Sequence, residues 1–154
     1  MSNFTIRKAE EVDAPQILAL IGALAAYEKI TICLTEEAVR RDMLGAACHC
    51  DLAFQDRQAV GIATWYWTYK TFGARRGLFV EDLYVHEAWR GHGLGRALLA
   101  HLAAKATAAG GFLEWQVLDW NSRAIAFYES LGAKPLGQWL NYRLDGEPLQ
   151  RLAL

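Results

Sequence analysis

The amino-acid sequence predicts a mixed α/β protein built around one central β-sheet. Apolar stretches with the period of a strand alternate with stretches that have the period of a helix, which is typical of a sheet covered by helices. Three β-prone runs follow one another with short breaks, as in antiparallel hairpins, and a later strand-helix-strand order favours a parallel pair. The 154 residues suit one domain of ordinary size, so we expect a single domain over residues 1–154.

Composition and charge limit the class of protein. Hydrophobic residues make up 53% and charged residues 21%, as in globular proteins, and the net charge of -1 argues against nucleic-acid binding through bulk charge. The N-terminal residues lack the apolar core of a signal peptide, and no apolar run reaches the ~20 residues needed to span a bilayer. We therefore expect a cytoplasmic protein that binds neither nucleic acid nor membrane.

Two of the three cysteines, Cys48 and Cys50, flank His49 and would share one side of a strand. A zinc site needs further ligands, and the sequence offers no second cluster of suitable residues. We expect free thiols and no bound metal.

The first part of the chain predicts one strand and two helices. Residues 4–7 alternate between apolar and polar side chains, which indicates a strand. Asp13 is placed to cap a helix over about residues 14–28, and Thr35 to cap a second helix over about residues 36–44. We expect both helices to cover the sheet.

Three strands are predicted next, at residues 48–54, 59–69 and 78–85. Each is rich in β-branched or aromatic side chains or in apolar residues. The breaks at residues 55–57 and 70–77 have the length of hairpin connections. The three strands should therefore be antiparallel neighbours.

Glycine recurs at every second position after the third strand, at Gly91, Gly93 and Gly95, and a helix is predicted over residues 93–108. A helix start carries unpaired N–H groups and the positive end of the helix dipole, and glycine lets the backbone approach an anion closely. The segment indicates an anion-binding loop; the alternative is a tight turn. It lacks the Gly-Lys-Ser/Thr of a P-loop, and the G-x-G-x-x-G fingerprint fails because position 96 is Arg.

The last part of the chain predicts a strand at residues 112–118, nearly parallel to the strand before the loop. Asp119 or Asn121 can cap a further helix that Gly132 ends. Two more strands are predicted, near residues 139–144 and 149–152.

Two segments of the chain resemble the signatures of the GCN5-related N-acetyltransferase (GNAT) superfamily. Residues 90–95, RGHGLG, match the acetyl-CoA signature Arg/Gln-x-x-Gly-x-Gly/Ala between a strand and a helix. Residues 121–128, NSRAIAFY, with Leu131-Gly132-Ala133 after them, resemble the family's second segment. The resemblance implies a GNAT fold, with a central mixed, mostly antiparallel sheet, flanking helices and a β-loop-α acetyl-CoA site.

Nearly the whole chain is similar to the diamine acetyltransferases, namely the spermidine/spermine and thialysine enzymes. This resemblance implies that the acetyl group of acetyl-CoA moves to a primary amine of a small molecule by direct attack. It also implies a homodimer. The matching segments are residues 4–7, 24–28, 68–69, 81–83, 89–91 and 120–128.

By this resemblance, the backbone of the strand before the glycine loop pairs with the pantetheine arm of acetyl-CoA, and an N–H group there stabilises an oxyanion. The amides of the loop hold the pyrophosphate. The expected cofactor-binding residues are Leu83, Tyr84, Val85, Arg90, Gly91, His92, Gly93, Leu94, Gly95, Arg96, Asn121, Ser122, Arg123, Ala124 and Tyr128.

Tyr128 and Glu81 are the candidate catalytic residues. A tyrosine pKa near ~10 suits proton donation to a thiolate whose pKa is near ~8.5; the alternative is a tyrosine of the core or a helix cap. By resemblance, Glu81 grips the amine cation and helps remove its proton through water. Glu81 and Asp82 adjoin in a strand and are expected on opposite faces, which assigns Asp82 a structural charge.

The amine site is expected to contain Tyr27, Glu28, Glu81, Glu114, Trp115 and Gln116, again by resemblance. Tyr27 and Glu28 end the first helix, where a carboxylate is unfavourable beside the helix dipole; the alternative is a fraying helix end. Glu114 and Gln116 share one strand face and Trp115 takes the other, so not all three are expected in the site.

One departure from the polyamine enzymes bears on the substrate. Those enzymes carry an acidic stretch before the residue matched by Trp139, whereas residues 135–138 here read PLGQ. A shorter amine, such as a diamine, thialysine or another lysine-like amino acid, is therefore a candidate substrate on equal terms with spermidine. Acetylation of a protein or peptide amine, and acetyl-CoA binding without turnover, remain as alternative functions.

Overall fold

The computed structural model describes residues 3–154; residues 1 and 2, which the predicted domain includes, lie outside the described residues. The chain forms two compact units, Met1–Gln116 and Val117–Leu154. The first unit contains the sheet, and the second contains the two C-terminal helices.

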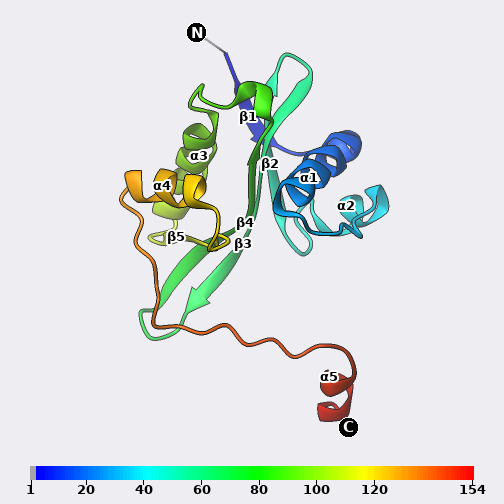
Figure 1. Ribbon diagram of the computed structural model, residues 1–154, viewed down its shortest axis with the longest axis vertical. Helices are drawn as coiled ribbons and strands as arrows, with labels where there is room; N and C mark the ends of the chain where they lie inside the picture. Colours follow the sequence, from blue (N-terminus) through cyan, green and yellow to red (C-terminus); the bar gives the residue numbers. More distant parts are fainter. Residues whose placement is uncertain (1–2) are drawn as a thin grey trace. The chain divides into compact units, whose positions relative to one another are not determined.

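The first unit is built on a five-stranded sheet with the order β1-β2-β3-β4-β5 (Figure 1). The first four strands are antiparallel, and β4 and β5 are parallel. The predicted mixed, mostly antiparallel sheet is thus confirmed. The strands are β1 (Thr5–Lys8), β2 (His49–Gln55), β3 (Gln58–Lys70), β4 (Arg75–Val85) and β5 (Phe112–Trp115).

Helices cover both faces of this sheet. The helices α1 (Ala14–Glu28) and α2 (Glu36–Asp42) lie on one face, and α3 (Leu94–Ala108) lies on the other (Figure 1). A Cβ atom at Gly61 would lie 3.1 Å from Leu98 Cδ1, so glycine allows α3 to pack closely on β3. Within residues 3–154, no helix is long and apolar enough to cross a membrane.

The two N-terminal helices begin differently. Thr35 caps α2 as predicted, because its Oγ1 accepts a hydrogen bond from the Ala38 N–H at 3.2 Å. Asp13 occupies the N-cap position of α1, but its side chain makes no cap bond to that helix. Its carboxylate instead accepts bonds from Arg7, at 2.7 and 3.0 Å, and from the Glu10 N–H, so the predicted cap is wrong.

A β-bulge interrupts β4. Thr64 pairs with Asp82, and the next residue of β3, Trp65, pairs with Val80, which leaves Glu81 as the extra residue. The pairing of β4 with β5 also ends at Val80, opposite Trp115. The predicted strand over residues 112–118 is therefore too long, because the bulge ends the ladder on which its last residues would pair.

The second unit contains α4 (Ser122–Ser130) and α5 (Gly146–Leu152). Asn121, not Asp119, caps α4, since its Oδ1 accepts from the Ala124 N–H at 3.2 Å. Within residues 117–154 no strand forms, so the strands predicted at 139–144 and 149–152 are wrong. A strand needs a partner for its backbone, whereas α5 closes its own hydrogen bonds and gains an i,i+4 pair between Glu147 and Arg151.

Candidate functional site

The bulge in β4 places two acidic side chains on one face of the sheet. Asp82 accepts a hydrogen bond of 2.5 Å from Thr64 Oγ1, and the carboxylate of Glu81 lies beside the Tyr66 hydroxyl. Thr64 and Tyr66 are alternate residues of β3 and share a face. The prediction that Glu81 and Asp82 point to opposite faces is wrong, because it assumed an unbroken strand.

Glu28, at the end of α1, lies close to Asp82. Burial raises the pKa of Asp82, and the hydrogen bond from Thr64 partly offsets this rise. Burial likewise raises the pKa of Glu28, and the negative charge of Asp82 adds to it. Two half-buried carboxylates therefore face a common space in which a cation would be favourable.

Glu81 shares its surroundings with Tyr66 and Cys48. Burial and then the charge of Glu81 raise the pKa of Tyr66. Burial also raises the pKa of Cys48, and the charges of Asp82 and Glu81 act in the same direction. Cys48 is free, as predicted, and its environment keeps it a neutral thiol instead of a nucleophile.

The three amine-site residues predicted on the last strand do not lie together. They are Glu114, Trp115 and Gln116. Glu114 pairs with Phe79 on the face of Tyr66, and its carboxylate lies 3.4 Å from Lys70 Nζ. Trp115 pairs with Val80 and takes the opposite face, as predicted. Gln116 lies beyond the end of β5.

The backbone of β4 has a free edge beside these carboxylates. Within residues 3–116, β4 is paired with β5 only from Gly77 to Val80. Leu83, Tyr84 and Val85 consequently have no strand partner on that side, although β3 pairs with them on the other. Such an edge can pair with an extended ligand.

The glycine loop connects the short helix η2 (Glu87–Trp89) to α3. Gly91 and Gly93 have φ values of +81° and +80°, a conformation that favours glycine, and no surrounding atom lies within 4 Å of a Cβ built at either. No side chain caps α3, so its first N–H groups are available to an anion. This open, uncapped backbone fits the pyrophosphate of acetyl-CoA.

Arg90 extends from the loop toward the face of the acidic residues. Its guanidinium carbon lies 5.4 Å from the ring centroids of both Tyr27 and Tyr84, and its Nε donates a 3.0 Å hydrogen bond to the Val85 carbonyl. Tyr27, in the last turn of α1, is thereby held next to the loop. Arg96, on α3, is exposed.

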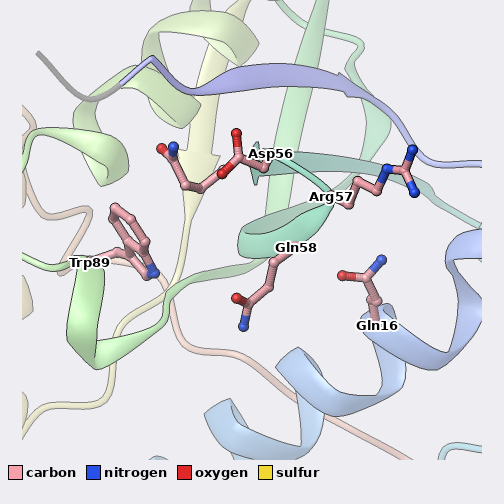
Figure 2. Close-up of a pocket in the computed structure, with 6 residues that line it drawn as sticks. Gln16, Asp56, Arg57, Gln58 and Trp89 are labelled. Atoms are coloured by element: carbon pink, nitrogen blue, oxygen red, sulfur yellow. The ribbon is translucent and has the colours of Figure 1, made fainter.

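A separate hollow of about 640 Å³ lies at the turn between β2 and β3, next to Trp89 (Figure 2). It is lined by polar side chains of that turn and of α1, and it contains none of the predicted site residues. Trp89 also packs edge-on against Phe4, with ring centroids 5.7 Å apart. We interpret Trp89 as an anchor for the start of the glycine loop.

The remaining predicted residues lie on or beside α4 in the second unit. Asn121 uses its side-chain oxygen to cap the helix, which Ser122, Arg123 and Ala124 begin. The carbonyl of Tyr128 accepts bonds from the N–H groups of Leu131 and Ala133, which close the end of α4. Their roles toward acetyl-CoA and in proton transfer stay predictions.

Sequence reasoning did not place Thr64 or Cys48 beside the acidic residues. Thr64 is a polar residue within a buried stretch of β3, which is a signal that a polar partner exists. The identity of that partner depends on the pairing of β3 with β4, and periodicity alone does not predict the pairing.

Comparisons with known proteins show the family of the chain. Residues 20–133 match the acetyltransferase (GNAT) family. The chain is 36% identical over 169 residues to thialysine N-epsilon-acetyltransferase of Bos taurus, covering 99% of each chain. It is 38% identical over 98 residues to an L-ornithine N5-acetyltransferase of Arabidopsis thaliana, covering 63% of this chain and 43% of that one.

Among solved structures, an integron cassette protein from the mobile metagenome of V. cholerae has a similar fold. The TM-score is 0.83 at 23% identity, with 99% of this chain and 98% of that chain covered. The chain therefore belongs to the acetyltransferase (GNAT) family and is an acetyl-CoA-dependent N-acetyltransferase.

Proposed function

We propose that this enzyme transfers the acetyl group of acetyl-CoA to a primary amine of a small molecule. The observation that carries the proposal is the gathering of Glu28, Glu81 and Asp82 on one face, next to the free edge of β4. A primary amine is a cation at neutral pH, because its pKa is near ~10.4, and these carboxylates suit it.

The substrate we favour is a lysine-like amino acid or a diamine. The relatives named above act on thialysine and on L-ornithine, both of which carry a terminal primary amine. Residues 135–138, PLGQ, supply no carboxylate for a second or third cationic nitrogen. We therefore expect spermidine to be a poorer substrate than a shorter amine.

When bound, acetyl-CoA supplies the activated acetyl thioester. The backbone of Leu83, Tyr84 and Val85 would pair with its extended arm, and an N–H group of this segment would stabilise the oxyanion. The amides of residues 91–96, with Arg90, bind the pyrophosphate. Residues 121–124, at the start of α4, are also proposed to bind acetyl-CoA.

The acidic residues have two different roles toward the amine, namely binding its ammonium group and accepting its proton. Asp82 and Glu28 hold the ammonium group, which revises the structural role predicted for Asp82. Glu81, the more exposed carboxylate, accepts the amine proton through water. Tyr128 donates a proton from its hydroxyl to the departing sulfur, because its ordinary pKa is near ~10.

We also propose that residues 1–154 act as one N-acetyltransferase domain, in a cytoplasmic homodimer that binds neither nucleic acid nor membrane. The net charge of -1 supports the absence of nucleic acid. Large apolar side chains of the second unit support a partner copy, since Trp139, Leu140 and Tyr142 are 70%, 78% and 92% exposed.

The test is thiol release from acetyl-CoA with a panel of amines: lysine, thialysine, ornithine, putrescine, spermidine and a lysine-containing peptide. We expect the highest kcat/KM for a lysine-like amino acid or a diamine. Acetylation of the peptide alone would instead support a protein acetyltransferase. Binding of acetyl-CoA without thiol release for any amine would indicate a module without turnover.

A further inference from the structure

Arg90 directly precedes Gly91 of the glycine loop, and its side chain contacts Tyr27 and Tyr84 near the proposed amine site. We propose that Arg90 is a positioning residue that couples binding of the coenzyme A pyrophosphate to the carboxylates that hold the amine. This inference rests on the proposed function and adds a link between its two ligands. It predicts that the two substrates help each other to bind.

The guanidinium group of Arg90 contacts two tyrosine rings and one backbone carbonyl. Tyr27 and Tyr84 each have their ring centroid 5.4 Å from its central carbon. The Nε group is committed to the Val85 carbonyl at 3.0 Å. A planar cation held by two rings and one hydrogen bond has a defined orientation, which a lysine could not reproduce.

Each of the two rings is attached next to a carboxylate of the amine site. Tyr27 directly precedes Glu28 in the last turn of α1. Tyr84 lies two residues after Asp82 on β4, and side chains two apart in a strand share a face. A change in the position of Arg90 would thus be transmitted through Tyr27 to Glu28 and through Tyr84 to Asp82.

At its other end, Arg90 directly precedes Gly91, where the backbone adopts φ +81° and the loop opens toward the uncapped start of α3. Because Nε is committed to Val85, a phosphate would be bound through the two Nη groups. The same phosphate would then fix the surface against which Tyr27 packs. Coupling of this kind is reciprocal, so a bound amine would tighten coenzyme A binding by the same factor.

The first test measures KM for both substrates in Arg90→Lys, which keeps the charge and loses the planar fork. At saturating acetyl-CoA, we expect the amine KM to rise by about fivefold or more. Arg96→Lys is the matched control, since Arg96 also flanks the loop but is exposed. That control should raise the acetyl-CoA KM and leave the amine KM unchanged.

The second test needs no turnover. The six tyrosines are labelled with 3-fluorotyrosine, and the Tyr27 resonance is identified in the ¹⁹F spectrum by its loss in Tyr27→Phe. In the wild-type protein, coenzyme A alone should move this resonance. In Arg90→Lys, saturating coenzyme A should leave it in place, with thermal unfolding used to confirm that the variant is folded.

Two outcomes would overturn the coupling. One is an amine KM in Arg90→Lys that matches the wild type at saturating acetyl-CoA, which would limit Arg90 to phosphate binding. The other is a Tyr27 resonance whose chemical shift does not change when coenzyme A is added to the wild-type protein. If no amine is acetylated at all, the proposed function fails, but the response of Tyr27 to coenzyme A still decides whether the loop and α1 communicate.

Discussion

Asp82 and Glu28 carry negative charge in surroundings that oppose it. Burial raises the pKa of both groups, and the charge of Asp82 raises that of Glu28 further. A carboxylate with a raised pKa in the folded state makes the protein less stable at pH values above that pKa. An ammonium ion bound between the two groups would relieve this cost. The same two charges that would favour amine binding therefore lower the stability of the free protein.

Asp82→Asn should stabilise the protein and weaken the binding of the amine substrate. Asparagine removes the buried charge, and its side-chain oxygen can still accept the bond from Thr64. We expect a higher Tm at pH 8 and an amine KM raised about tenfold or more, the usual cost of losing a charged hydrogen bond. Thermal unfolding and steady-state kinetics measure the two effects, and the exposed Asp119→Asn serves as control.

The stability difference should depend on pH in one direction. The folded pKa of Asp82 lies above its unfolded value, so the folded state binds more protons between the two, and the free energy of unfolding falls as pH rises through that window. The Tm advantage of Asp82→Asn should therefore be largest at neutral to alkaline pH and shrink in acid. An advantage that grows as the pH falls would contradict the charge explanation.

The kcat/KM of the wild-type enzyme for the amine should also depend on pH, through the ionisation of Glu28 and Asp82. Glu28 and Asp82 attract a cation only when ionised, and their raised pKa values move this ionisation above the usual carboxylate range. We expect kcat/KM for the amine to rise as pH increases past these values, and the rise should be displaced in Glu28→Gln. A pH profile with an unchanged acid limb in that variant would remove Glu28 from the site.

Tyr128→Phe tests the proposed proton donor. Removing the hydroxyl should lower kcat by about a hundredfold, which is the scale of general acid catalysis, with little effect on the affinity for acetyl-CoA. Rapid kinetics and equilibrium binding of coenzyme A separate the two effects. Tyr69→Phe, at a residue that is 62% exposed, is the matched control, and equal turnover in both variants would exclude Tyr128 as the acid.

At the scale of elements, the loop before α3 depends on backbone conformation more than on side chains. Gly93 is the N-cap of α3 and has φ +80°. An alanine there would have space, but the left-handed conformation costs it about 1–2 kcal/mol. The loop is thus sensitive to the smallest possible substitution.

Gly93→Ala should raise the acetyl-CoA KM strongly while leaving the amine KM little changed. Gly22→Ala is the control, because Gly22 lies inside α1 with nothing within 4 Å of the added Cβ. That control should increase the free energy of unfolding by about 0.5–1 kcal/mol, since alanine is favoured over glycine in a helix. Coenzyme A binding and chemical denaturation provide the two measurements.

At the scale of the whole molecule, the exposed apolar residues of the second unit predict association of two copies. We expect the mass of a dimer by light scattering at micromolar concentration. Trp139→Glu combined with Leu140→Glu should shift the mass toward the monomer, because charge opposes burial of that surface. Val12→Glu, at a position 76% exposed in the first unit, should leave the mass unchanged.

Much of the fold could be predicted from the sequence, because the signals that define an element are local. The period of apolar residues identifies α1, α3 and the first four strands, and the chemistry of Thr35 and Asn121 places two helix starts. The same local reasoning fails at α5, where it predicts a strand although Leu, Gln, Glu and Arg favour helices. A strand forms only where another strand can accept its hydrogen bonds, and a single stretch of sequence contains no information on that partner.

The sequence by itself determined that a glycine-rich loop joins a strand to a helix, since three glycines at alternate positions are a feature of a few adjacent residues. Only the tertiary structure decided what lies beside that loop. The bulge that turns Glu81 and Asp82 to one face depends on the register of β3 against β4, and the stack of Arg90 on Tyr27 depends on how α1 packs on the sheet. Register and packing are contacts between distant parts of the chain, so no local pattern encodes them.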